Sequence, residues 1–350
     1  MKIKELLIMA KEEDASDLHL NVGIPPVLRI NGKLKKLDLP ELTPESTHEM
    51  IYSILNERQK TDFEKYGELD LSYDLANVAR FRTNVFKHRR GEGAAFRLIP
   101  EKIKTLSELN LPSILSNFTE KDKGFVLLTG PTGSGKSTTL AALIDIINKN
   151  RYDNIITIED PIEFIHYHKN CLISQREVGS HTKSFASALR NALREDPDVI
   201  LVGEMRDLET ISMALTAAET GHLVFSTLHT ISAGETVERI IDVFPPHQQN
   251  QVRMQLAGSI LGIVAQTLMP TLDGKGRVPA LEVMIANPAI RNLIREGKTY
   301  QIPSTIQISK KDGMQSLDQS LKDLLMEGKI SREDAIKKAI DKKAFMEHHY

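Results

Sequence analysis

One nine-residue segment has the residue types and the spacing of a phosphate-binding loop. It consists of Gly130, Pro131, Thr132, Gly133, Ser134, Gly135, Lys136, Ser137 and Thr138. Glycines let consecutive backbone N–H groups and a helix N-terminus face a polyphosphate, Lys136 can reach the β and γ oxygens, and the Ser137 hydroxyl can bind Mg²⁺. An apolar run at 125–128 precedes the loop and a helical pattern follows it, which is the context that the motif requires. The sequence therefore predicts a site for a nucleoside triphosphate.

Acidic residues follow the next predicted strand. Glu159, Asp160 and Glu163 lie at or just beyond the end of the strand expected at 154–159. Phosphoryl transfer to water needs a group that orients or deprotonates the water, and acidic groups around the magnesium ion. The three carboxylates fit that need, although a solvated turn or a helix N-terminus would have the same composition.

The strand predicted at 198–203 resembles a Walker B strand with one departure. Gly203 stands where such a strand usually carries the aspartate on the magnesium side, so Glu204 is expected to act on the metal through a bound water. The next strand, 222–228, is followed by His229, for which a structural and a catalytic role both stay open. Because ligands of open α/β sheets bind at the carboxyl ends of strands, we expect these strand ends to converge on one nucleotide.

The composition limits the class of protein. The 350-residue chain has a formal net charge of −2 and a pI near 6.6, so no overall field draws it to nucleic acid or an anionic bilayer. Cys171 is the only cysteine, which excludes an internal disulfide and a four-cysteine zinc site and fits a reducing compartment. No apolar run approaches the roughly 18 residues of a membrane span, and the first residues lack the shape of a signal peptide. We expect a cytoplasmic protein that contacts a membrane only peripherally.

A change in the hydrophobic pattern near residue 105 predicts two domains. Residues 1–100 are expected to form a small α+β domain that includes a hairpin turning at Asn31-Gly32. Residues 101–114 are expected to be the linker. From 115 to 350 strands alternate with helices, which is typical of a mainly parallel α/β sheet wrapped by helices.

Four motifs occur in the order found in the ATPases of the secretion superfamily. They are GPTGSGKST at 130–138, TIEDPIEF at 157–164, LREDPDVILVGEMRD at 193–207 and TGHLVFSTLHT at 220–230. They match the Walker A, Asp box, Walker B and His box of that family. With ASDLHL at 15–20 and AIRNLIRE at 289–296, essentially the whole chain resembles the type IV pilus retraction ATPases of this superfamily.

The resemblance implies both a fold and an activity. The fold would be a RecA-like P-loop ATPase domain with C-terminal helices, preceded by a PAS-like domain. The activity would be hydrolysis of ATP with Mg²⁺ by a homohexameric ring that powers pilus retraction and twitching motility. The ring would act at the inner face of the cytoplasmic membrane, against an inner-membrane platform protein of the pilus machinery, and no nucleic acid is expected as a partner.

The matching motifs also imply roles for individual residues. Lys136 and Ser137 would hold phosphate and magnesium, and Glu204 would support the metal. Glu163 is the first choice for the group that activates water. His229 would sense or position the γ-phosphate region.

Two arginines of the N-terminal domain match the family's arginine-bearing strands. They are Arg82, in the strand 79–86, and Arg97, in the segment 95–97. Guanidinium groups neutralise charge that spreads over the transferred phosphoryl group, so the resemblance implies that both arginines reach a nucleotide in the ring. An ordinary basic face is the alternative.

The AIRNLIRE segment is predicted to be a short, delimited helix. Asn287 can cap its start, and Gly297 suits its end. Ile290, Leu293 and Ile294 share one face, which fits core packing. The resemblance instead implies a part in retraction.

Two further functions stay open at this point. An assembly or secretion ATPase of the same superfamily would have the same nucleotide site. Those enzymes usually carry extra N-terminal domains and a four-cysteine zinc module, for which this chain has neither room nor cysteines. A nucleic-acid-dependent RecA-like translocase would use the basic cluster at 80–97. The near-neutral net charge and the few aromatic residues in that cluster weigh against it.

Overall fold

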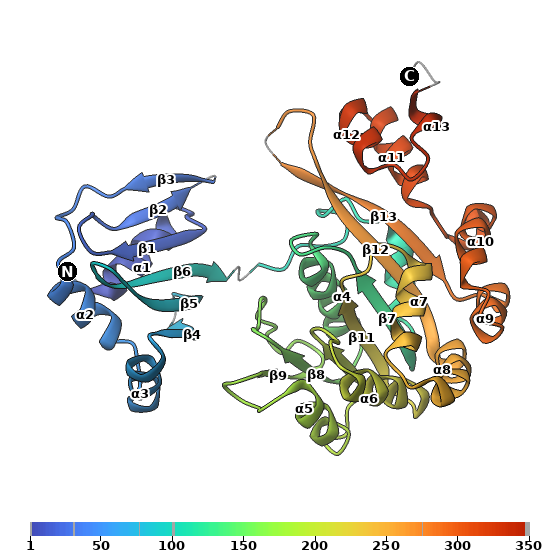
Figure 1. Cartoon of the computed structure of the whole chain (residues 1–350), viewed down its shortest axis with the longest axis horizontal. Coiled ribbons are helices and arrows are strands. Elements are labelled where there is room, and N and C mark those ends of the chain that lie inside the picture. The colour runs from blue at the N-terminus through green and yellow to red at the C-terminus, as the bar shows by residue number, and fades with distance from the viewer. Residues whose placement is uncertain (1, 31, 77, 100–101, 275, 347–350) are drawn as a thin grey trace. The chain divides into compact units, whose positions relative to one another are not determined.

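The structure is a computed structural model that describes residues 2–30, 32–76, 78–99, 102–274 and 276–346. The chain forms two compact units. One comprises residues 1–102 and 163–165, and the other comprises residues 103–162 and 166–350. Each unit contains its own sheet, six-stranded in the first and seven-stranded in the second (Figure 1).

The first unit is a small α+β fold. Its antiparallel sheet has the order β3 (Lys33–Lys36), β2 (Val27–Ile30), β1 (Asp17–Asn21), β6 (Gly91–Ile99), β5 (Ala79–His88) and β4 (Glu68–Leu75). Its helices are α1 (Ile3–Glu12), α2 (Pro44–Tyr52) and α3 (Glu57–Tyr66). Leu6 and Leu7 of α1 join Phe63, Phe81 and Phe96 in one core, so the helices cover the apolar face of the sheet.

Local sequence signals explain several boundaries in this unit. Helix α2 begins where the Thr43 hydroxyl accepts a hydrogen bond from the Ser46 N–H at 3.2 Å, and Pro44 occupies its first turn. The predicted hairpin is present as the antiparallel pair β2 and β3. Gly32 has a φ of 79°, which an L-residue rarely adopts, whereas Asn31 lies outside the described residues.

The second unit is a doubly wound α/β fold. Its sheet has the order β13 (Arg277–Ile285), β12 (Ile260–Pro270), β7 (Gly124–Thr129), β11 (Leu223–Leu228), β10 (Val199–Val202), β8 (Asn154–Glu159) and β9 (Leu172–Glu177). Every neighbouring pair is parallel except β12 and β13. The strands predicted at 124–129, 154–159, 198–203 and 222–228 are therefore confirmed as adjacent parallel strands, whose carboxyl ends share one edge.

Helices cover both faces of this sheet. The elements are η1 (Ser113–Phe118), α4 (Lys136–Asn150), α5 (Phe185–Ala192), α6 (Leu208–Glu219), α7 (Ala233–Asp242), α8 (Pro246–Ser259), α9 (Pro288–Arg295), η2 (Thr299–Gln301), α10 (Ile302–Ile308), η3 (Lys310–Asp312), α11 (Leu317–Met326), α12 (Arg332–Lys338) and α13 (Lys343–Met346). In β7, Val126 and Leu128 pack with α4 on one face, and Phe125 and Leu127 pack with α5 to α9 on the other. Burial on both faces explains why β7 is continuously apolar.

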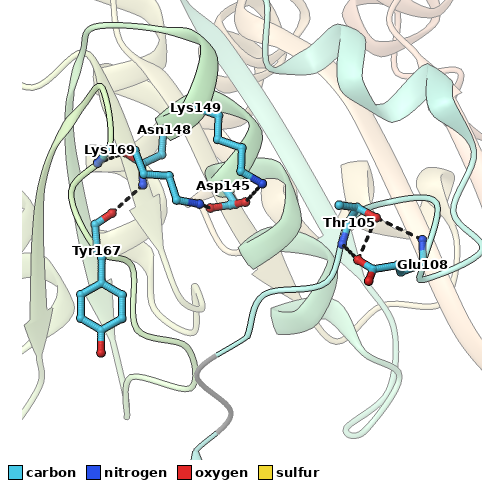
Figure 2. Close-up of polar contacts among 7 residues, drawn as sticks. All are labelled: Thr105, Glu108, Asp145, Asn148, Lys149, Tyr167 and Lys169. Carbon is cyan, nitrogen blue, oxygen red and sulfur yellow. Dashed lines mark hydrogen bonds and ion pairs between the residues drawn. The ribbon is translucent and has the colours of Figure 1, made fainter. Parts of the chain in front are cut away.

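The segment expected to link the domains is partly packed onto the second unit. Leu106 and Leu111 are buried in the core that contains α4. Thr105 and Glu108 form a local turn, in which the Glu108 carboxylate accepts hydrogen bonds from the Thr105 N–H and hydroxyl at 2.8 and 2.9 Å (Figure 2). No helix among the described residues is long and apolar enough to cross a bilayer.

Candidate nucleotide and catalytic site

The predicted phosphate-binding loop joins β7 to α4. Gly133 and Gly135 have φ values of 77° and 88°, in the left-handed region that glycine adopts without strain. A Cβ atom at Gly130 would lie 2.2 Å from the Gln266 carbonyl oxygen, so this position also requires glycine. The loop ends at the N-terminus of α4, where unpaired N–H groups and the helix dipole favour an anion. The geometry is that of a phosphate site.

Lys136 lies buried in this loop. Its ammonium group donates hydrogen bonds to the carbonyl oxygens of Gly130 at 2.7 Å and Pro131 at 3.0 Å. The charge is therefore held against the loop that would surround a phosphate. Ser137 and Thr138, at the start of α4, are half-buried.

Gln266 of β12 holds the loop from the side, and the sequence did not single it out. Its amide nitrogen donates to the Ser134 carbonyl oxygen at 2.6 Å, and its amide oxygen accepts from the Thr139 hydroxyl at 2.9 Å. Gln266 is 4% exposed, so these groups have little access to solvent. The sequence signal is one amide within a mostly apolar strand.

Glu204 and His229 lie together at the ends of adjacent strands β10 and β11. His229 Nε2 is 3.5 Å from Glu204 Oε2, and Arg206 is 2.7 Å from Glu204 Oε1. Glu204 is mostly buried, whereas Arg206 and His229 are exposed. The structure thus joins the predicted Walker B acid to the predicted His-box histidine.

The departure at Gly203 has a packing reason. The Gly203 N–H donates to the Ile158 carbonyl oxygen at 2.7 Å, which draws the backbone against β8. A Cβ atom at Gly203 would lie 3.2 Å from that oxygen and 3.3 Å from the Glu159 Cα. This close approach leaves little space for an aspartate side chain.

A buried carboxylate fixes the segment after His229. Glu282 of β13 accepts a hydrogen bond from the Ala233 N–H at 2.7 Å, at the first residue of α7. Burial raises the pKa of Glu282, and the hydrogen bond from Ala233 opposes that shift. Glu282 was also not predicted, because its partner is distant in sequence.

The acids of the Asp box have separate environments. Glu159 accepts hydrogen bonds from the Thr157 hydroxyl at 2.6 Å and the Gln175 amide at 3.1 Å. Glu163 is exposed and belongs to the first compact unit, whereas Lys136, Glu204 and His229 belong to the second. The structure therefore groups Glu204 with His229, whereas Glu163 belongs to the other compact unit.

Arg82 and Arg97 lie directly opposite each other on β5 and β6 of the first unit. The Arg97 Nε donates to Asp17 Oδ1 at 2.9 Å, and Arg82 is exposed. Burial raises the pKa of Asp17, but hydrogen bonds from Ser16 and Arg97 outweigh it, so the pKa lies below its usual value. Like charges opposite each other destabilise a sheet, and the ion pair of Arg97 with Asp17 offsets part of that repulsion.

A cavity of about 430 Å³ adjoins the loop within the second unit. Gly135, Thr138 and Thr139 line one side, and Gln266 and Leu268 line another. The remaining lining comes from Lys104, from residues 108–111 and from the segment 276–279. The cavity thus extends the phosphate site toward the β12 and β13 strands.

The donor set suits a magnesium ion that is bound together with phosphate. The described residues contain no cluster of three His, Cys, Asp or Glu side chains that could hold a metal by themselves. Mg²⁺ commonly takes one or two protein oxygens, substrate phosphates and waters. Ser137 beside the loop and Glu204 at the end of β10 are side chains of that kind.

The fold and the loop define a P-loop ATPase. The chain belongs to the type II/IV secretion system protein family, whose sequence model matches residues 2–337. It is 53% identical over 339 residues to the type IV pilus retraction ATPase PilT of Pseudomonas aeruginosa, covering 97% of this chain and 98% of that protein. It is 53% identical over 314 residues to a twitching motility protein of Neisseria gonorrhoeae, covering 90% and 84%.

Solved structures agree with this assignment. A crystal structure of the pilus retraction motor PilT with bound ADP superposes with a TM-score of 0.93 at 50% identity, covering 98% of both chains. The ATPase DotB of Legionella pneumophila superposes with a TM-score of 0.79 at 30% identity, covering 95% of this chain and 93% of that one. The predicted fold class, an α/β P-loop ATPase domain preceded by a small α+β domain, is confirmed.

Proposed function

We propose that this chain is a motor that hydrolyses ATP to retract type IV pili and so drives twitching motility. The observation that carries the proposal is the phosphate-binding loop beside the Glu204–His229 pair, in a chain that aligns end to end with a retraction motor. The working form is a homohexamer. It acts in the cytoplasm, at the inner face of the membrane, against a platform protein of the pilus machinery.

The residues of the predicted motifs divide the chemistry among them. Lys136 and the loop N–H groups bind the phosphates, because they place positive charge and donors around one helix N-terminus. Mg²⁺, held by Ser137 and through water by Glu204, would neutralise phosphate charge when bound. Glu163 accepts the proton of the attacking water. His229, which lies beside Glu204, senses or positions the γ-phosphate region.

Residues of the first unit complete the site across copies of the chain. Arg82 and Arg97 of one copy neutralise the charge of a nucleotide bound to another. Asp17 supports this role because it orients Arg97 while Arg82 stays exposed. In this proposal residues 1–100 form the PAS-like arginine-bearing domain, 101–114 the linker and 115–350 the RecA-like motor domain.

The cavity beside the loop takes the base and ribose of the nucleotide. Leu268 offers an apolar surface, and Lys104, Asn110 and Arg277 offer polar groups. Polar groups placed around an apolar side chain can orient a nucleobase and a ribose.

Pilus retraction in cells tests the proposal directly. A strain that lacks this gene should extend pili without retracting them. The wild-type gene should restore retraction, and Lys136→Ala should not. Loss of pilus extension or secretion would instead indicate an assembly or secretion ATPase, and stimulation of ATP hydrolysis by single-stranded DNA would indicate a translocase.

A further inference from the structure

The segment that carries Glu163 is anchored at two points to one strand. The Ile162 N–H donates to Glu177 Oε2 at 3.1 Å, and the His166 N–H donates to Gln175 Oε1 at 2.8 Å. Gln175 and Glu177 lie two residues apart on β9, which corresponds to about 6.6 Å along the strand. A segment from 162 to 166 reaches about 13 Å when extended. The segment between the two anchors, called the bow below, is therefore longer than the spacing of its two anchor residues along β9, and it contains Glu163.

Gln175 uses both ends of its amide in this arrangement. Its oxygen accepts from His166, and its nitrogen donates to the Glu159 carboxylate at 3.1 Å. The Thr157 hydroxyl donates to the same Glu159 oxygen at 2.6 Å. Gln175 thus connects Glu159, at the end of β8, to His166, at the C-terminal end of the bow.

The buried Glu177 carboxylate holds the N-terminal end of the bow, at Ile162. It is 4% exposed, and its second oxygen accepts from the Ser180 hydroxyl at 3.0 Å. A buried carboxylate that accepts several hydrogen bonds has little freedom to move, because any shift leaves a charged oxygen without donors. The Ile162 N–H, one residue before Glu163, is consequently fixed.

The chain after the bow is anchored to the helix that follows the phosphate-binding loop (Figure 2). Asn148 of α4 donates to the Tyr167 carbonyl oxygen at 2.8 Å and accepts from the Lys169 N–H at 3.1 Å. The buried Asp145 side chain pairs with the ammonium groups of Lys149 and Lys169. These contacts hold 167–170 against α4, and the bonds from Glu177 and Gln175 hold the two ends of the bow against β9.

We propose that Gln175 and Glu177 are positioning residues that set the place of Glu163 for the attacking water. The inference rests on the catalytic role proposed above for Glu163. Neither side chain needs to touch the nucleotide, because each acts through a backbone N–H on one side of the bow. Small misplacements of a catalytic group cost large factors in rate. Both residues should therefore affect turnover much more than nucleotide binding.

The test compares Gln175→Met and Glu177→Gln with Arg176→Gln in the full-length assembled protein. Arg176 lies between them on β9, but its guanidinium pairs with Glu195 at 2.9 Å, so it serves as the matched control. We expect kcat to fall about 10- to 100-fold in the first two variants, with the Kd of a fluorescent ADP analogue and the KM for ATP within about 2-fold of wild type. Arg176→Gln should keep its kcat. Hydrogen exchange of peptides that cover 160–167 should accelerate only in the first two, with the loop 130–138 unchanged.

A double-mutant cycle separates this inference from the proposed role of Glu163. If Gln175 acts through Glu163, adding Gln175→Met to Glu163→Gln should lower the residual single-turnover rate by less than about 2-fold. In another outcome, Glu163→Gln is inactive in steady state while Gln175→Met still lowers the single-turnover rate of the double variant by its full factor. That result would overturn the positioning role and leave the proposed role of Glu163 standing. Full turnover by Glu163→Gln would overturn the role of Glu163 and the inference with it. Loss of ADP binding in both β9 variants would assign them to folding and would also overturn it.

Discussion

His229 Nε2 lies 3.5 Å from Glu204 Oε2, although 25 positions separate the two residues in the sequence. Parallel pairing of β10 with β11 creates this contact, because it aligns the two strands and leaves both side chains at the same sheet edge. The Thr227 hydroxyl also donates to the Gly203 carbonyl oxygen at 2.6 Å, just before both residues. A change at either residue therefore alters the immediate surroundings of the other.

Glu204→Gln should lower kcat by about 100-fold or more, because it removes a charge from the metal side of the site. His229→Gln should cost about 10-fold, and the two losses should be strongly non-additive if the residues act as a pair. Steady-state kinetics of both single variants and the double variant measure this coupling. Arg206→Gln is the control, since the Arg206 side chain is exposed and its ion pair with Glu204 should contribute little. Simple multiplication of the two losses would show that the residues act separately.

Glu163→Gln should abolish turnover and retain nucleotide binding, because it removes the proposed base and leaves the phosphate loop intact. Lys136→Ala should weaken both, since its ammonium belongs to the loop. Parallel measurements of ATP hydrolysis and ADP affinity distinguish the variants. Near-normal turnover in Glu163→Gln, with loss in Glu159→Gln or Glu204→Gln, would assign water activation to another acid.

Arg82→Ala and Arg97→Ala should each lower turnover while rings still form, because in the proposed function both arginines act on a nucleotide held by another copy. Asp17→Asn should produce a smaller loss, since it weakens the hydrogen bond that orients Arg97 without removing the guanidinium. Mass measurement in solution monitors assembly, and Arg58→Ala on the exposed side of α3 is the control. Wild-type rates in both arginine variants, or a fully active monomer, would contradict this expectation.

The stability of the second unit should decrease in mild acid because of His166. Burial lowers the pKa of His166 to about 4, with the Asp145 charge opposing the shift. The ordinary value is 6.5, so between these pH values the unfolded chain binds more protons and stability falls as the pH falls. The loss from pH 7.5 to 5 should be about 2 kcal/mol. Denaturant midpoints should show that His166→Leu reduces this pH dependence, whereas His247→Gln at an exposed site does not.

The sequence predicted the parts of the site that local patterns define. The phosphate-binding loop, the four parallel strands and the Asn287 cap of α9 are all present, and the Asn287 side chain accepts from the Ile290 N–H at 3.0 Å. Each of these depends on residues close together in the chain. The fold class followed from the alternation of strands and helices and from the family motifs.

Gln266 and Gln175, which hold other parts of the candidate site in place, could not be predicted in the same way. Gln266 contacts Ser134 and Thr139 across more than 120 positions, and no local pattern marks an amide for that role. Gln175 lies on an edge strand that the hydrophobic pattern did not reveal, because β9 is mostly polar. Hydrogen bonds between distant segments become visible only once the sheet order is known.

Leu293→Ala should separate ATP hydrolysis from mechanical work. Ile290 and Ile294 are fully buried in the core of the second unit, whereas Leu293 is half-buried against that core. Truncating Leu293 should therefore cost only about 1 kcal/mol of stability, against about 2–5 kcal/mol for Ile294→Ala, which is the packing control. Helix α9 itself stays in place because the Arg291 guanidinium donates to the Ala257 and Gly258 carbonyl oxygens at 2.5 and 2.8 Å.

We expect the Leu293→Ala protein to assemble and to hydrolyse ATP at most of the wild-type rate while pilus retraction fails. The reason is that α9 lies outside the phosphate site and presents Leu293 at the margin of the core, where motion of the motor domain could be passed to a partner. ATPase assays, ring assembly and retraction in cells are measured on the same variant. A loss of ATP hydrolysis in proportion to retraction, or unfolding like that of Ile294→Ala, would show that Leu293 is ordinary core and that α9 transmits nothing.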